Sequence, residues 1–257
     1  MIIGAQMFTV HEQCQTLEGI SESLKKIADI GYKSVQVSGT CPYDAMWLKE
    51  ELDKNGLTCN LTHIPYDNLI NHTEKVIKDH DILECKYIGV GSMPHIFEPG
   101  ASKKNWVDFA NDTMIIGKKI AESGHYYMYH NHSHEFKKDE NGEYAMEYLT
   151  KTIPAEYMGY TLDTYWIKAG GHDIIEWFEK LKNQIPCIHL KDMKIMNDGE
   201  QRYAPIGKGI IDFEKVIEKA LELNVEYAFV EQDKSYGEDP FDCLKQSYEY
   251  LTSLGLK

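Results

Sequence analysis

The sequence predicts a single (β/α)8 barrel over residues 1–257, and three observations support this fold class. Apolar runs of strand length alternate with amphipathic runs of helix length along almost the whole chain. There are eight such pairs, the number that a closed barrel of parallel strands requires. The alternative, a doubly wound open sheet, usually shows a Gly-rich phosphate loop after its first strand, and the sequence has none there.

The strands and helices follow from hydrophobic periodicity and from the residues at their ends. Thr16, Asp173 and Asp212 are expected to cap helix N-termini, and Gly31 lies where a helix-ending glycine belongs. A polar hairpin is expected near 137–144, and a long excursion follows the seventh strand at 194–209. The expected strands are 2–8, 34–39, 57–64, 86–93, 126–132, 158–166, 187–193 and 227–233, and the expected helices are 16–30, 43–55, 71–84, 103–123, 145–151, 173–182, 212–223 and 240–253.

Composition excludes several classes of protein. The chain is 42% hydrophobic and has 27 Lys and Arg against 41 Asp and Glu, a net charge of −14 that disfavours nucleic-acid partners. No apolar run reaches the roughly 18–20 residues that a membrane helix needs, so no membrane partner is expected. The start lacks the basic and long apolar regions of a signal peptide, and the six cysteines form no Cys-x-x-Cys pair. We therefore expect a cytoplasmic protein with reduced thiols.

The densest group of reactive side chains lies at the end of the fifth expected strand. Tyr129 is followed by His130, His132, His134 and Glu135 within six residues. Alternate residues of a strand share one face, so His130 and His132 point the same way. Two imidazoles at a strand end suit a divalent metal or proton transfer. The alternative is a polar strand end whose histidines satisfy local hydrogen bonds.

The next three strands each deliver one further ligand type directly after an apolar run. These residues are Asp163, His189 and Glu231. In a barrel the carboxyl ends of the strands meet at one face, where active sites lie. Buried carboxylates need partners, and a shared divalent cation supplies one. Mixed nitrogen and oxygen ligation suits Mn, Zn, Co or Fe better than Ca or Mg.

Each of these residues also has a structural interpretation when it is taken alone. Asp163 could cap the following turn, His189 could be a core histidine, and Glu231 could pair with Lys191. Lys191 and Asp192 could form a solvated pair at the rim, and Trp166 could fill the core. The joint pattern on successive strands favours a site.

The chain resembles the xylose isomerase-like barrel superfamily, in particular its sugar phosphate isomerase/epimerase group, which includes inosose dehydratases and keto-sugar epimerases. The resemblance implies one divalent metal held by Glu, Asp, His and Glu from strands five to eight. Asp163, His189 and Glu231 match the last three, while His130 stands at the first, with His132 or Glu135 as competing candidates. The motifs that carry it are Tyr129–His132 with Glu135–Phe136, Leu162–Thr164 with Trp166, His189–Asp192, Pro205–Gly209 with Asp212, and Val230–Glu231.

What the resemblance implies is a metal-dependent isomerase or epimerase of a keto-sugar or related polyol, working through an enediolate. Mn or Zn is the first choice of metal, with Co, Fe or Mg as further candidates. Glu231, with Glu135 or His132, would move the proton, and Lys191 would stabilise the developing oxyanion. His63 and Trp166 would line the sugar pocket. The partner is a small carbohydrate or polyol, and a homo-oligomer is compatible with the sequence.

Other functions fit parts of the same pattern. A dehydratase of a keto-polyol such as an inosose would share the enediolate step, and a non-catalytic sugar-binding barrel or partner subunit would explain the missing glutamate. An apurinic-site endonuclease is disfavoured, because Trp166 replaces its second zinc histidine and Arg202–Pro205 lacks its Asp-x-His pair. Phosphate recognition stays open, with Gly207–Gly209 as a weak candidate.

Overall fold

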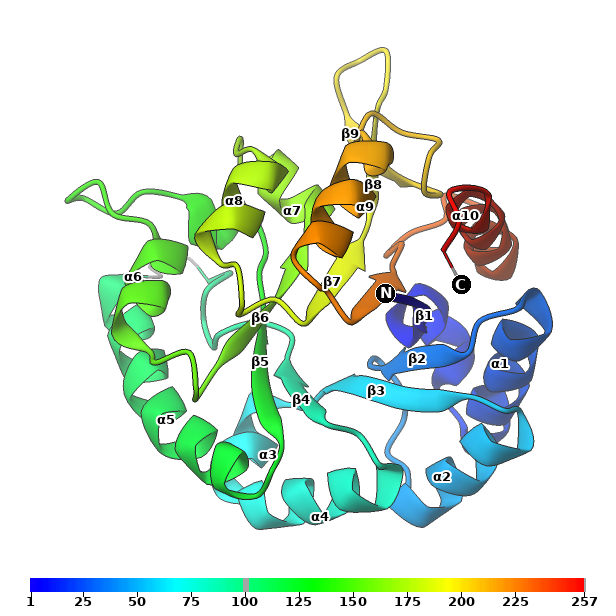
Figure 1. The fold of residues 1–257 in the computed structure, drawn as a ribbon, viewed down its shortest axis with the longest axis horizontal. Coiled ribbons are helices and arrows are strands. Elements are labelled where there is room, and N and C mark those ends of the chain that lie inside the picture. Colours follow the sequence, from blue (N-terminus) through cyan, green and yellow to red (C-terminus); the bar gives the residue numbers. More distant parts are fainter. Residues whose placement is uncertain (99–101, 257) are drawn as a thin grey trace.

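Eight parallel strands close into a barrel in the computed structural model, which describes residues 1–98 and 102–256 (Figure 1). The barrel closes where the first and last strands pair, with Ile2 opposite Tyr227 and Ala5 opposite Val230. The predicted (β/α)8 fold is therefore confirmed. The barrel strands are β1 (Ile2–Gln6), β2 (Ser34–Val37), β3 (Thr58–His63), β4 (Tyr87–Val90), β5 (Tyr126–His130), β6 (Gly159–Asp163), β7 (Cys187–Leu190) and β10 (Tyr227–Val230).

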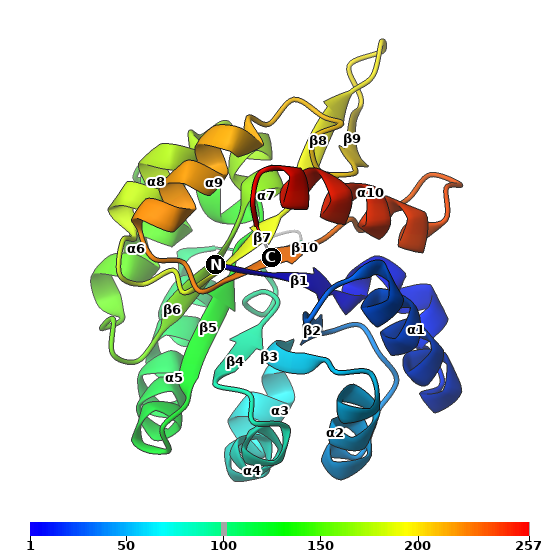
Figure 2. The same cartoon turned by 45° about the vertical axis from the view of Figure 1, so that its right-hand side comes forward.

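Helices surround the barrel on its outside, as both ribbon views show (Figures 1 and 2). Thr16, Asp173 and Asp212 each accept a hydrogen bond from a backbone N–H of the first turn, so these three predicted caps are confirmed. The helices are α1 (Leu17–Ile30), α2 (Ala45–Lys54), α3 (Tyr66–Asn71), α4 (Thr73–Leu83), α5 (Lys103–Glu122), α6 (Ala145–Thr152), α7 (Thr164–Ala169), α8 (Ile174–Lys180), α9 (Phe213–Glu222) and α10 (Pro240–Ser253), with short 3-10 helices η1 (Met7–Cys14) and η2 (His134–Phe136).

The structure differs from the predicted elements mainly after strands six and seven. The expected strand 158–166 stops at Asp163, because this residue caps α7 and turns the chain. The expected strand 187–193 stops at Leu190, and the chain then enters β8 (Asp192–Ile195), which pairs antiparallel with β9 (Gln201–Ala204). This hairpin projects beyond the barrel (Figure 2). Within 137–144, Lys138 and Tyr144 form an antiparallel bridge.

The interior of the barrel is apolar in one half and polar in the other. A separate cluster of buried side chains fills one half, and it consists of Leu61, Tyr87, Met128, Cys187 and Phe229. Toward the carboxyl ends of the strands the interior holds buried polar side chains instead, among them Gln36, His130 and His189. On β5, Met128 and His130 share the inward face and belong to the apolar and the polar half, while Tyr129 packs outward on Phe109 of α5.

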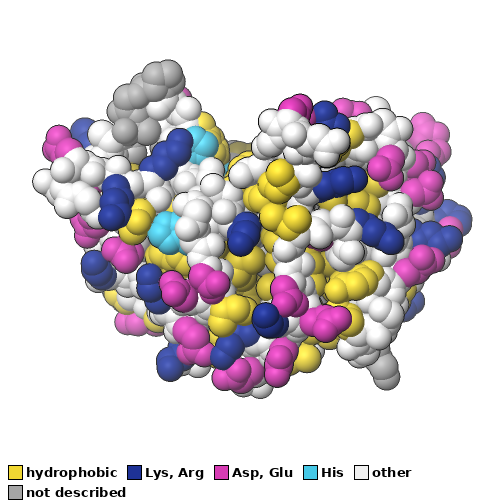
Figure 3. Space-filling view, turned by 90° about the horizontal axis from the view of Figure 1, so that it is seen from above, with side chains coloured by type: hydrophobic (Ala, Val, Ile, Leu, Met, Phe, Trp, Pro, Cys, Tyr) yellow, Lys and Arg dark blue, Asp and Glu magenta, His cyan; other side chains and the backbone are white. Residues whose placement is uncertain are grey.

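Among the helices of residues 1–98 and 102–256, none combines the length and the apolar composition needed to cross a bilayer. Acidic and basic side chains are interspersed over the face shown in Figure 3.

Candidate metal centre

Four buried side chains converge at the carboxyl end of the barrel. His130, Asp163, His189 and Glu231 each present one ligating atom, and these four atoms lie within 4.8 Å of one another. Asp163 Oδ2 is 3.2 Å from His130 Nε2 and 3.7 Å from His189 Nδ1. His189 Nδ1 is 2.9 Å from Glu231 Oε2. The residues predicted from successive strand ends therefore do come together at one point.

Both histidines of this cluster are held by their second ring nitrogen. His130 Nδ1 lies 3.0 Å from the carbonyl oxygen of Gly91, and His189 Nε2 lies 2.6 Å from Gln36 Oε1. A carbonyl oxygen only accepts, so the proton of each neutral ring is fixed on the nitrogen that faces away from the cluster. The other nitrogen then presents its lone pair inward. This is how metal-binding histidines are oriented by their surroundings.

Asp163 has a separate partner for each carboxylate oxygen. Oδ1 accepts a hydrogen bond from the backbone N–H of Trp166 at 3.0 Å and thereby caps α7. Its own backbone N–H donates to Asn131 Oδ1 at 3.0 Å, which ties β6 to the end of β5. Oδ2 is left to face the two imidazoles. The capping interpretation is confirmed for Oδ1, and Oδ2 is placed where the predicted ligand role requires an oxygen.

Lys191 is the cation of the site. Its ammonium is fully enclosed, 2.6 Å from Asp233 Oδ1, 2.9 Å from Glu231 Oε2 and 3.5 Å from Asp163 Oδ2. Burial opposes the charge, but the fields of these three carboxylates raise the pKa of Lys191 well above its usual value. The interpretation of Lys191 and Asp192 as a solvated rim pair is wrong, because both side chains are buried.

The pKa shifts in the metal-free cluster favour the binding of a cation. Burial alone would raise the pKa of Asp163 and Glu231, but Lys191 and the neighbouring imidazoles lower both. Burial likewise disfavours a charge on His189, yet Glu231 and Asp163 raise its pKa to about 9. The proton on His189 Nδ1 thus lies among carboxylate oxygens, because this nitrogen is 2.9 Å from Glu231 Oε2 and 3.7 Å from Asp163 Oδ2. A metal ion with these ligands would replace that proton.

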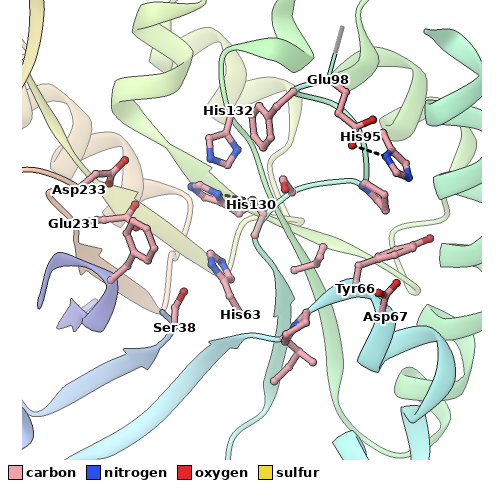
Figure 4. Close-up of a pocket in the computed structure, with 18 of the residues that line it drawn as sticks. Ser38, His63, Tyr66, Asp67, His95, Glu98, His130, His132, Glu231 and Asp233 are labelled. Carbon is pink, nitrogen blue, oxygen red and sulfur yellow. Dashed lines mark hydrogen bonds and ion pairs between the residues drawn. The ribbon is translucent and has the colours of Figure 1, made fainter. Parts of the chain in front are cut away.

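A cavity of about 640 Å³ opens above the cluster. His63 and His132 line it together with His130, Glu231 and Asp233, and Figure 4 shows these side chains directed toward a common space. Burial and then the field of His130 lower the pKa of both His63 and His132 well below the ordinary value, so both rings are neutral. His63 Nε2 and His132 Nδ1 have no hydrogen-bond partner within the described part of the chain.

Two other predicted site residues do not line the cavity. Glu135 is fully buried and accepts hydrogen bonds from the hydroxyl of Tyr129 at 2.5 Å and the backbone N–H of His132 at 2.9 Å. It therefore holds the segment that carries His132. Trp166 packs 5.2 Å from the ring of His132, and its face lies 5.2 Å from the ammonium of Lys191.

Sequence reasoning missed Asp233 and Gln36. Strand alternation could have identified Asp233, since it lies two residues after Glu231 and so faces the same side. Gln36 lies within an apolar strand, and its contact with His189 spans 153 positions, so no local pattern indicates it.

The glycine-containing segment after β9 has a structural role that the sequence did not reveal. The carboxylate of Asp192 accepts backbone N–H groups from Gly207 at 3.0 Å, Gly209 at 2.8 Å and Ile211 at 3.2 Å. A side chain at Gly209 would collide with Asp192 and the carbonyl oxygen of Met193. The amides proposed as a weak phosphate candidate are thus already occupied by a carboxylate of the chain itself.

A comparison with protein-family models gives the same class as the geometry. The model described as xylose isomerase-like TIM barrel matches residues 24–254, so the chain belongs to this family. No curated protein sequence matches it.

Solved structures with the same fold cover nearly the whole chain. A sugar phosphate isomerase/epimerase from Parabacteroides distasonis has a TM-score of 0.80 at 22% identity, with 98% of this chain and 93% of that one covered. D-psicose 3-epimerase from Clostridium cellulolyticum has a TM-score of 0.74 at 13% identity, with 100% of each chain covered. A probable 3-DHS dehydratase from Bacillus anthracis has a TM-score of 0.73 at 14% identity, with 98% of this chain and 99% of that one covered. At these low sequence identities, the similarity shows a shared fold.

Proposed function

We propose that this protein is a divalent-metal-dependent isomerase or epimerase of a keto-sugar or related polyol. Proton abstraction next to a carbonyl would give an enediolate, and return of a proton would complete the reaction. His130, Asp163, His189 and Glu231 would hold the metal, with Mn or Zn as first choice for this mixed ligand set. L-ribulose 3-epimerase and D-psicose 3-epimerase share this fold, which supports the substrate class.

One observation carries the proposal. Two imidazoles have their ring protons directed to fixed acceptors, the Gly91 carbonyl and the Gln36 amide, while their other nitrogens face two carboxylate oxygens. In the metal-free protein a proton on His189 Nδ1 lies among these atoms, and a divalent ion bound by the same four side chains would take its place. When bound there, a divalent ion polarises a carbonyl and acidifies the adjacent C–H group.

The chain's own residues supply the remaining chemistry. Glu231 uses Oε2 in the cluster, and no described residue hydrogen-bonds its Oε1, which makes that oxygen the candidate for taking the substrate proton. His132, a neutral ring at the cavity wall, is the candidate for the second proton carrier. As one of its ring nitrogens gives a proton to the enediolate, the other would take one from solvent, and Glu231 would later release the substrate proton to solvent. Lys191, whose three donors face carboxylates, would stabilise the negative oxygen that develops through its electric field and not by a direct hydrogen bond. His63 would bind a hydroxyl. We propose that Glu135 positions His132 rather than transferring a proton itself.

Metal content and solvent exchange test this proposal together. Purified protein should carry close to one Mn or Zn per chain after reconstitution. In deuterium oxide, a panel of keto-sugars and inososes should then include a compound that gains deuterium at the carbon next to its carbonyl. Chelator-treated protein should give no exchange. Loss of a hydroxyl from the exchanging compound would identify a dehydratase, since dehydration shares the enediolate step.

A matched pair of variants gives the control. Glu231→Gln removes the proposed base and should abolish exchange. Glu218→Gln makes the same chemical change on the exposed face of α9 and should leave exchange unaltered. A protein that binds a metal stoichiometrically and exchanges none of the panel would contradict the proposed chemistry.

A further inference from the structure

The charges around the cavity bear on which substrates it accepts. Four carboxylates line it, those of Asp67, Glu98, Glu231 and Asp233. Within the described residues, Lys191 is the single Lys or Arg side chain in the lining. The acidic side chains of the lining therefore outnumber its Lys and Arg side chains by four to one before any metal is bound.

The ammonium of Lys191 is not free to bind an anionic substrate group. Its three donors face three carboxylates, with the nearest oxygens 2.6, 2.9 and 3.5 Å away. The aromatic faces of Trp166 and Tyr203 also pack on the ammonium, each with its ring centroid 5.2 Å from the nitrogen. A phosphate would have to displace one of the carboxylates to reach it.

Charge in the inner site balances once a divalent metal is present. Two positive charges on the ion offset Asp163 and Glu231, and Lys191 offsets Asp233. What remains unbalanced is the outer rim, where Asp67 and Glu98 are exposed and His95 hydrogen-bonds Glu98 at 2.8 Å. A phosphate at the far end of a substrate whose carbonyl sits over the cluster would lie close to this acidic rim (Figure 4).

Backbone groups offer no alternative anion site at the candidate that the sequence suggested. The N–H groups of Gly207 and Gly209 donate to Asp192. The N–H of Trp166, in the first turn of α7, donates to Asp163. Donors that usually hold phosphate are thus committed to the chain's own carboxylates.

We infer that the cavity takes an uncharged, unphosphorylated keto-sugar or keto-polyol and discriminates against sugar phosphates. This inference rests on the proposed function, because it uses the metal to place the carbonyl end of the substrate. The rim carboxylates supply the discrimination. At separations of about 8 Å in a water-like dielectric, each would weaken binding of a phosphate dianion about fivefold, hence roughly 25-fold together.

Matched pairs of ligands test the inference. Titration calorimetry of Mn-loaded protein at pH 8, in low salt, would compare D-ribulose with D-ribulose 5-phosphate and D-fructose with D-fructose 6-phosphate. The free sugar of at least one pair should bind roughly 25-fold more tightly than its phosphate. The ratio should fall toward one in the double variant Asp67→Asn/Glu98→Gln and at high salt, whereas Glu218→Gln should leave it unchanged.

The outcomes separate the two proposals when solvent exchange is followed on the same samples. Tighter binding of the phosphate, or equal binding of both members, overturns the inference while leaving enediolate chemistry intact. Selective binding of free sugars without exchange supports the inference and contradicts the proposed function. Failure of both members of every pair to bind overturns both.

Discussion

Buried polar side chains occur in two settings in this barrel, and they are satisfied differently. Asp192 and His80 lie outside the metal cluster, and all their polar atoms are paired. Each oxygen of Asp192 accepts two backbone N–H groups. The ring nitrogens of His80 bond the Val76 carbonyl at 2.7 Å and the Thr62 hydroxyl at 2.8 Å. In the cluster, by contrast, the inward atoms of two imidazoles and two carboxylates converge within 4.8 Å of one another, with a proton of His189 among them.

This difference teaches which buried polar groups serve the fold and which serve a ligand. A saturated group such as Asp192 stabilises the structure, because its hydrogen bonds replace those that water would make. The metal cluster gathers two carboxylates and two imidazoles in a buried space, and this arrangement lowers the stability of the fold unless a cation binds there. Such a group of side chains indicates a ligand site. The two settings should therefore respond in opposite ways to conservative substitution.

The largest expected effect is the loss of metal in Asp163→Asn. The amide keeps an oxygen to cap α7, so the fold should persist, but it removes one anionic ligand. Metal content measured by atomic spectroscopy should fall from about one to below a tenth per chain, and solvent exchange should drop by on the order of a thousandfold, as befits several kcal/mol of lost carbonyl polarisation. A variant that retains one metal per chain would place the metal elsewhere.

Asp192→Asn should show the reverse behaviour. Its NH2 group would face backbone N–H donors that now bond a carboxylate, so the free energy of unfolding should fall by about 3 kcal/mol. Metal content per folded chain should stay unchanged. Denaturant unfolding supplies the measurement, with Asp173→Asn as control, because asparagine caps α8 about as well as aspartate. If metal is lost while stability is kept, the distinction between the two settings fails.

Most of the fold could be predicted from the sequence because its signals are local. Alternating apolar runs located all eight barrel strands, and Thr16, Asp173 and Asp212 marked helix starts. The errors arose where a side chain redirects the backbone. Asp163 ends β6 by capping α7, and the hairpin β8–β9 depends on Asp192 gathering amides up to 19 positions away. No periodicity carries that information.

The ligand set could be proposed from the sequence because barrel topology brings successive strand ends together. Its supporting residues could not. Gln36 bonds His189 across the barrel, and Glu135, which the sequence offered as a proton-transfer residue, points its carboxylate to Tyr129 and away from the cavity. Orientation of this kind depends on tertiary packing, which spacing along the chain does not determine.

A moderate effect is expected from Gln36→Met, which tests how far the cluster depends on its surroundings. Methionine conserves volume but cannot accept the His189 ring proton, so the ring loses the contact that fixes its tautomer. Metal affinity, measured by competition with a chelating dye, should weaken about 10- to 100-fold. Gln6→Met is the matched control. Gln6 lies beside Gln36 in the sheet, and among the described residues its side chain bonds the N–H of Phe8 and no other group. Equal affinities in the two variants would exclude a role for the Gln36 contact.

The smallest effect is expected at His80, both of whose ring nitrogens are hydrogen-bonded. This residue should affect the pH dependence of stability and not the metal content. Burial lowers its pKa from 6.5 to about 4 in the folded protein. The unfolded chain therefore binds more protons between these values, and stability is fully present above pH 6.5 and declines as the pH falls toward 4. The slope of the unfolding free energy should reach at most about 1.4 kcal/mol per pH unit from this group. His80→Gln should flatten that slope and leave metal content at pH 8 unchanged. An unaltered slope would show that burial does not keep the imidazole of His80 neutral in the folded protein.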